Sequence, residues 1–137
     1  MLLTVNEIQD KVNLLGSIIN IPSKDLHIYP SPLGDGTPHI AIEGDSYNYV
    51  YSERGIEFCR RTTSSLDKLL YWIMFDFIHE IAVRYELKNR VPYQDGRRII
   101  FPMIIDLMAK INPEWGIRVK NEINNTLQSS PYDDTTY

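Results

Sequence analysis

Residues 39–61 read HIAIEGDSYNYVYSERGIEFCRR, and this stretch decides the fold. It holds three short runs of alternating apolar and polar residues, separated by Gly44-Asp45 and Arg54-Gly55. Two-residue turns that contain glycine, placed between alternating runs, are typical of β-hairpins. The stretch therefore predicts an antiparallel meander with the strands His39–Glu43, Ser46–Glu53 and Ile56–Arg61.

Closing both turns fixes which residues face each other. Glu43 then lies opposite Ser46, and Tyr51 lies opposite Phe58. Because side chains alternate along a strand, one face carries Ile40, Ile42, Tyr47, Tyr49, Tyr51, Ile56 and Phe58. The other face carries His39, Ala41, Glu43, Asn48, Ser52, Glu57, Cys59 and Arg61. Arg60 falls on the apolar face in this register and would need a buried partner.

The segment before the meander predicts a helix and a loop. Thr4-Val5-Asn6-Glu7 fits a capping box, and apolar residues then recur every three or four positions as far as Ile19. Residues 30–38 read PSPLGDGTP, a composition that disfavours regular structure. A short strand over Leu26–Tyr29 would make the sheet four-stranded.

The segment after the meander predicts three helices. Apolar residues at helical spacing predict a long central helix over residues 65–87. A third helix is expected over residues 99–111, where Pro102 must lie in the first turn or kink the helix. Asn112-Pro113-Glu114 is typical of a helix start, with a cap, a proline and an acid near the dipole.

These patterns and the composition predict one α+β domain. Its elements are an N-terminal helix, a small antiparallel β-meander, and a long central helix with two further helices packed on one sheet face. The chain has 137 residues, 43% hydrophobic and 23% charged, the size of one ordinary domain. We expect residues 1–128 to form this single domain and residues 129–137 to be a disordered tail. No secretory signal or membrane span is visible, so we expect a cytoplasmic protein.

Charge and motif content exclude several function classes. Fourteen basic and eighteen acidic residues give a formal charge of −4, which argues against general nucleic-acid binding. The single cysteine, Cys59, excludes an intramolecular disulfide and a thiolate zinc site. His79-Glu80 lacks the second histidine of a zinc-peptidase motif, because Val83 stands in its place. We expect no catalytic residue, no metal and no cofactor.

The arginines leave two interpretations open. In one, Arg60, Arg97 and Arg98 act with Glu86 on an anionic substrate in a cleft, and the chain is a small enzyme. In the other, which we favour, the arginines pair with acids of the domain and stabilise it. A third possibility is an adaptor that pairs through its tyrosine-rich strands, which would require an exposed row of tyrosines.

The acidic N-terminal half offers a candidate partner-binding surface. Residues 1–59 hold eight acidic and three basic residues, and charge complementarity would favour a basic partner. The candidate binding residues lie in the loop, at a turn or on the polar sheet face: Asp35, His39, Glu43, Asp45, Asn48 and Glu57. A merely solvated face is the alternative.

A pattern of aromatic, arginine and acidic positions runs from Gly44 to Ile123. Its members are Tyr47, Tyr49, Glu53-Arg54-Gly55, Arg60, Leu69-Leu70-Tyr71-Trp72, Tyr85-Glu86, Arg90, Asp95, Arg97-Arg98, Phe101 and Trp115. The pattern resembles a family of bacterial polymorphic-toxin immunity proteins, the one numbered sixty-three. The resemblance implies a cytoplasmic protein that is made beside a toxin and neutralises it by stoichiometric binding, without catalysis.

The resemblance also implies partners and a structural role for the recurrent charged residues. The expected partner is a cognate toxin domain, such as a basic nuclease, with no direct contact to nucleic acid or membrane. The protein itself would be a monomer or a weak homodimer. Six of the family positions are expected to form an internal salt-bridge frame: Glu53, Arg60, Glu86, Arg90, Asp95 and Arg97.

Overall fold

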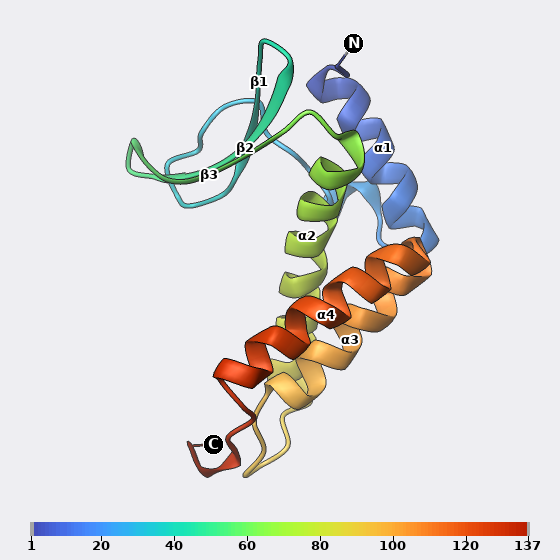
Figure 1. Ribbon diagram of the computed structural model, residues 1–137, viewed down its shortest axis with the longest axis vertical. Coiled ribbons are helices and arrows are strands. Elements are labelled where there is room, and N and C mark those ends of the chain that lie inside the picture. The colour runs from blue at the N-terminus through green and yellow to red at the C-terminus, as the bar shows by residue number, and fades with distance from the viewer. Residues whose placement is uncertain (1, 137) are drawn as a thin grey trace. The chain divides into compact units, whose positions relative to one another are not determined.

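The computed structural model describes residues 2–136 and confirms the α+β class (Figure 1). Its elements are α1 (Val5–Ile18), β1 (His39–Glu43), β2 (Ser46–Glu53), β3 (Ile56–Thr63), α2 (Leu66–Lys88), α3 (Arg97–Ile111) and α4 (Pro113–Ser129). Two short 3₁₀ turns, Ser23–Asp25 and Asp134–Thr136, complete them. The chain divides into two compact units, residues 1–73 and 74–137, and the boundary falls inside α2.

The first helix begins as the sequence predicts. The amide of Glu7 donates to Thr4 Oγ1 at 3.2 Å, and Glu7 Oε1 accepts from the Thr4 amide at 3.0 Å. This capping box satisfies two amide groups that have no partner within the helix. Ile8 and Val12 then point into the core of the first unit and are fully buried.

Leu26–Tyr29 does not form the short strand that was predicted. The side chain of Gln9 donates to the Leu26 carbonyl at 2.8 Å and accepts from the Ile28 amide at 2.8 Å. Tyr29 makes a single backbone bond to the sheet, where its carbonyl accepts the amide of Ile40 at 2.8 Å. A side chain of α1 therefore satisfies the backbone groups that a fourth strand would pair, and the sheet has three strands.

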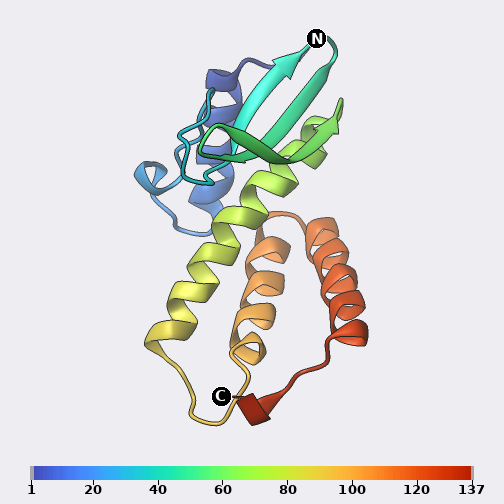
Figure 2. The ribbon, with the colours of Figure 1, turned by 90° about the vertical axis from the view of Figure 1, so that its left-hand side faces the viewer.

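The sheet is an antiparallel meander in the order β1-β2-β3 (Figure 2). The register between β1 and β2 is the predicted one, with Glu43 opposite Ser46 and Ile40 opposite Tyr49. Tyr47 and Tyr49 are buried, and the Tyr47 hydroxyl accepts the amide of Leu3 at 2.8 Å. The adaptor interpretation required an exposed tyrosine row, so the burial of these two residues contradicts it.

The register between β2 and β3 differs from the prediction halfway along the pair. The turn at Arg54-Gly55 is the predicted one, because Glu53 lies opposite Ile56. A β-bulge then inserts one extra residue into β3, so that Tyr51 faces Cys59 instead of Phe58. Bulges of this kind leave one residue unpaired and bend the strand that carries it.

The bulge reverses the faces of β3 from Cys59 onward. Tyr49 faces Arg61 rather than Arg60, and the Arg61 guanidinium lies over the ring of Trp72, 5.7 Å from its centroid. Arg60 is exposed and lies on the polar face. The predicted placement of Arg60 on the apolar face, and of Cys59 and Arg61 on the polar face, was therefore wrong, because one extra residue inverts the alternation.

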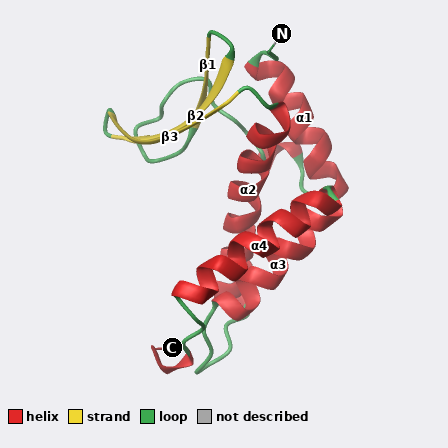
Figure 3. Ribbon diagram, viewed as in Figure 1, coloured by secondary structure: helices red, strands yellow, loops and turns green. Residues whose placement is uncertain are grey.

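The second unit contains the end of α2 and the helix pair α3–α4 (Figure 3). These two helices approach closely, since a Cβ on Gly116 would lie 2.5 Å from that of Ala109. Pro102 is the sixth residue of α3, in the second turn, and the helix continues past it to Ile111. Asn112 caps α4 as predicted, with its Oδ1 accepting the amide of Glu114 at 2.9 Å.

Candidate partner-binding surface

The polar face of the sheet gathers three charged side chains, Glu43, Glu57 and Arg60, which we call the sheet cluster. Arg60 donates to Glu57 Oε1 at 2.7 Å and Oε2 at 3.1 Å, and to Glu43 Oε2 at 3.5 Å. Residues three apart lie on opposite faces of a regular strand, so the β-bulge is what brings Glu57 and Arg60 together. Two carboxylates against one guanidinium leave the cluster negative, and hydrogen bonds from Arg60 lower the pKa of Glu57.

His39 and Asn48 lie on the same face but differ in burial and in hydrogen bonding. The buried Asn48 amide donates to the Ala41 carbonyl at 3.3 Å and accepts from Thr62 Oγ1 at 2.7 Å. His39 is half-buried, and its Nδ1 has no hydrogen-bond partner within the part of the chain that the structure describes. Burial, and then the charge of Arg60, lower the pKa of His39, so its imidazole is neutral at pH 7.

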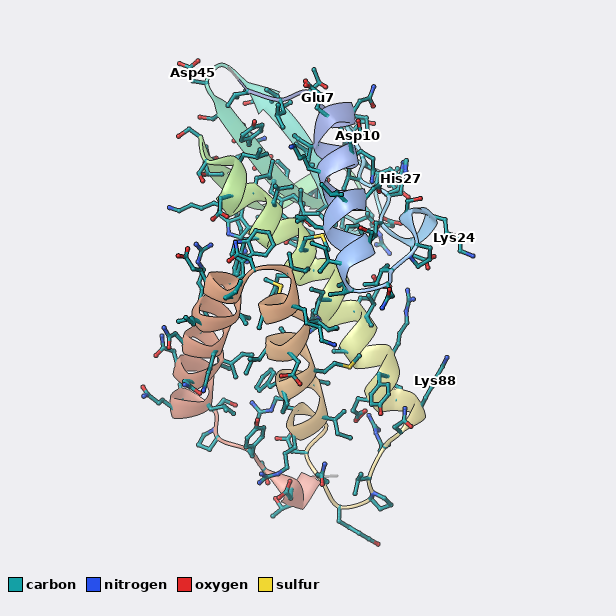
Figure 4. The ribbon with its side chains drawn as sticks, turned by 90° about the vertical axis from the view of Figure 1, so that its right-hand side faces the viewer. Glu7, Asp10, Lys24, His27, Asp45 and Lys88 are labelled. Atoms are coloured by element: carbon teal, nitrogen blue, oxygen red, sulfur yellow. The ribbon has the colours of Figure 1, made fainter. Side chains whose placement is uncertain are left out.

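Asp35 and Asp45 lie at opposite ends of β2. Asp45 is part of the turn between β1 and β2, at the tip of the sheet (Figure 4). Asp35 forms an isolated backbone bridge with Glu53, and its side chain accepts the amide of Thr37 at 2.9 Å. Hydrogen bonds from Thr37 lower the pKa of Asp35, so this end of the strand carries an ionised carboxylate at neutral pH.

The loop before β1 and the sheet carry an excess of negative charge. Residues 30–63 contain five carboxylates and three guanidinium groups, a balance of −2. The structure therefore brings Glu43 and Glu57 together around Arg60 and places Asp35 and Asp45 at the two ends of β2. Asn48 is bonded within the sheet.

The residues expected to form a salt-bridge frame are divided between the two units of the chain. Arg60 pairs with Glu43 and Glu57 rather than with Glu53. In the second unit, Arg90 Nε donates to Glu86 Oε1 at 3.0 Å, and this carboxylate is buried. Arg60 and Arg90 each pair with an acid three or four residues away, and Arg60 also reaches Glu43 on β1, the other outer strand of the sheet.

Asp95 is a carboxylate of the second unit with several hydrogen-bond partners. It is buried, and it accepts from Arg97 Nη2 at 2.8 Å and from the backbone amides of Arg97 and Asp133, each at 3.0 Å. Hydrogen bonds from Arg97, and then from Asp133, hold the pKa of Asp95 well below its usual range. The carboxylate is therefore ionised although it is buried.

The residues that follow α4 make contacts with this carboxylate and its neighbours. Arg97 Nη1 donates to the Ser130 carbonyl at 3.0 Å, and Arg98 Nε donates to Asp134 Oδ1 at 3.0 Å. Asp134 Oδ1 also accepts the amide of Asp95 at 2.7 Å. Composition predicted disorder over residues 129–137, whereas residues 130–134 are fixed by these bonds. We call Asp95, Arg97, Arg98 and Asp134 the tail cluster.

The geometry does not favour the enzyme interpretation. Arg60, Arg97 and Arg98, which would have to meet in a cleft, are each paired with an acid nearby. A cavity of about 360 Å³ in the second unit is lined instead by Phe75, Asp76, His79, Phe101, Ile104, Val119, Glu122, Ile123 and Thr126. Among the described residues, no group of three or more His, Cys, Asp or Glu side chains could hold a metal ion.

One exposed feature of the sheet escaped the sequence analysis. Ile56 and Phe58 were assigned to the apolar face that the central helix and two further helices would cover, yet both are exposed. The Phe58 ring lies 6.2 Å from that of Tyr51, on the same side of the sheet. Alternation predicts which side a residue points to, but it cannot predict where the covering helices end.

Comparisons with known proteins identify the family. The family model of Immunity protein 63 matches residues 43–125, more than half of the chain. No curated protein and no solved structure matches the chain. No helix of the described residues is long and apolar enough to cross a membrane.

The span matched by the family model includes β2, β3, α2 and α3, and with them the sheet cluster and Asp95. The chain belongs to the Immunity protein 63 family, whose members are immunity proteins against toxins.

Proposed function

We propose that this protein binds a cognate toxin domain in a one-to-one complex and neutralises it without any catalysis of its own. Family membership gives the class of partner. The observation that supports binding through the first unit is the sheet cluster, in which Arg60 holds two exposed carboxylates in a fixed position. A fixed, electronegative surface suits recognition of a basic protein, because complementary charges select the partner and speed association.

The predicted binding residues divide into two groups. The contacts to the toxin come from the exposed carboxylates Asp35, Glu43, Asp45 and Glu57. His39 and Asn48 belong to the same face but are less exposed than these carboxylates. Asn48 is already bonded to its neighbours, so it stabilises the surface that the toxin contacts. Specific complexes bury about 1,600 Å² in total, so contacts beyond these six residues are also needed.

The charge of this surface suggests what kind of toxin it recognises. A nuclease that acts in the cytoplasm carries a basic face that contacts the phosphate backbone. A protein that covers that face with carboxylates excludes the nucleic acid and stops the reaction. We place this interaction in the cytoplasm of the producing cell, with a monomer of this chain bound to one toxin domain.

The test uses the toxin domain encoded by the gene beside this one. Calorimetric titration should give a one-to-one complex, and titration of the toxin activity should reach full inhibition at the same ratio. The affinity should fall as salt is raised, because exposed charges contribute. A toxin domain that neither binds nor is inhibited would show that the proposed function is wrong.

A charge variant with a matched control tests the surface. Glu43→Gln with Glu57→Gln should weaken binding about tenfold, mainly through slower association. The control, Asp10→Asn with Asp25→Asn, removes the same charge from exposed positions elsewhere in the first unit. Equal weakening by both variants would contradict binding at the sheet face.

A further inference from the structure

We propose that the tip of the β2–β3 hairpin is the apolar anchor of this toxin-binding surface. The hairpin tip consists of Glu53, Arg54, Ile56 and Phe58, which line a shallow hollow of about 430 Å³. Its occupant is an aliphatic or aromatic side chain of the toxin, flanked by basic residues. This inference rests on the proposed function and adds to it the site that supplies most of the affinity.

The exposure of two large apolar side chains carries the inference. Ile56 is 70% exposed and Phe58 is 61% exposed, although they lie on the face that buries Tyr47 and Tyr49 further along the sheet. Neighbouring exposed apolar residues with a polar rim are typical of a site that another protein covers. Aromatic residues near the centre of such a site commonly supply much of the binding energy.

The hairpin tip is held rigidly, as an anchor should be. Arg54 and Gly55 both have positive φ, at 53° and 78°, as the tightest two-residue hairpin turns require. The loop before β1 runs along the same hairpin, where the Arg54 amide donates to the Gly34 carbonyl at 3.0 Å. The Gly36 amide donates to the Ser52 carbonyl at the same distance. A surface fixed before binding loses little conformational entropy when the partner arrives.

The side chain of Phe58 lies beside a row of aromatic rings on β2. Its ring lies 6.2 Å from that of Tyr51, which in turn lies 5.2 Å from the ring of Tyr49, edge to face. This row leads from the buried part of the sheet to the exposed hairpin tip. The bulge is where the row leaves the core, because Phe58 is the extra residue of β3 between Glu57 and Cys59.

The surrounding charge favours a toxin over a second copy of this chain as the occupant. Glu57 lies between Ile56 and Phe58 in the sequence and belongs to the sheet cluster. Residues 30–63 have a balance of −2, so two copies that met at their hairpin tips would bring like charges together. A basic partner gains from the same charges.

The experiment compares two double variants of the full chain. Ile56→Thr with Phe58→Thr places residues that favour β-strands at both positions while removing the apolar anchor. The control, Leu14→Ala with Ile117→Ala, removes side chains that are 62% and 64% exposed on α1 and α4. Binding to the toxin domain from the neighbouring gene is measured by calorimetry, thermal unfolding checks the fold, and sedimentation velocity of each protein alone reports its oligomeric state.

The anchor predicts a loss of at least about a hundredfold in affinity for the threonine variant, with an unchanged melting temperature. The control should bind like the wild type, and all three proteins should sediment as monomers. Wild-type binding by the threonine variant, or equal weakening by the control, would overturn the anchor and leave the proposed function intact. A wild-type dimer that the threonine variant abolishes would also overturn it. Failure of the wild type to bind would reject the proposed function itself.

Discussion

The sheet cluster and the tail cluster contain the same residue types but differ in how far their carboxylates are buried. In each cluster, arginine donates to one carboxylate nearby in the sequence and to another on a distant segment. In the sheet cluster the Glu43 side chain is 63% exposed, whereas Asp95 of the tail cluster is 1% exposed. A buried carboxylate has lost its water and depends on its partners, while an exposed one does not. The comparison shows that burial, and not pairing, separates charges that hold the fold from charges that can meet a partner.

The largest effect is expected at Asp95. Asp95→Asn should lower the free energy of unfolding by about 3 kcal/mol, because it leaves Arg97 without its charged partner in a buried setting. Chemical denaturation measures this change. The matched control is Asp106→Asn, an exposed carboxylate on α3, which should change stability by less than about 0.5 kcal/mol. A small loss for both variants would mean that the tail cluster does not stabilise the fold.

The contribution of Asp95 to stability should depend on pH. Its pKa in the folded chain is held below the value of about 3.9 that an unfolded chain has. Its stabilising effect is therefore complete above pH 4 and is lost as the pH falls through the folded pKa. Denaturation between pH 6 and pH 2.5 should show the difference between wild type and Asp95→Asn shrinking below pH 4. A difference that stays constant over this range would contradict the assignment.

A smaller effect is expected at Asn48, a polar residue buried on the sheet face. Asn48→Ala should lower the free energy of unfolding by about 1.5 kcal/mol, because Thr62 and the Ala41 carbonyl lose their bonds. Urea denaturation measures it. A weaker toxin affinity without any loss of stability would instead make Asn48 a direct contact.

The smallest effect on stability is expected at Arg60. Arg60→Ala should leave the free energy of unfolding close to that of the wild type, because its ion pairs are exposed to solvent. The same denaturation curves measure it. A loss as large as that of Asp95→Asn would remove the distinction between the two clusters.

Local signals in the sequence predicted much of the fold. The turns at Gly44-Asp45 and Arg54-Gly55, the capping box at Thr4 and the cap at Asn112 depend on a few adjacent residues. Each such signal carries its own physical cause within three or four positions. The same holds for the α+β class, which follows from the change of hydrophobic period after Arg61.

Features set by distant parts of the chain were not predictable in this way. The bulge in β3 was missed because Arg60-Arg61 places one charge on each face in either register, so alternation does not choose between them. The strand at Leu26–Tyr29 was wrong because the competing partner is Gln9, seventeen residues away. The exposure of Phe58 depends on where the covering helices end, and no local pattern records that.

Hydrogen–deuterium exchange with and without the toxin domain tests the central claim most directly. The account predicts that binding slows exchange in β2, β3 and the turn between them, residues 46–63, and leaves the amides of residues 95–98 and 130–134 unchanged. Slower exchange confined to the tail cluster, with the hairpin unaffected, would contradict it.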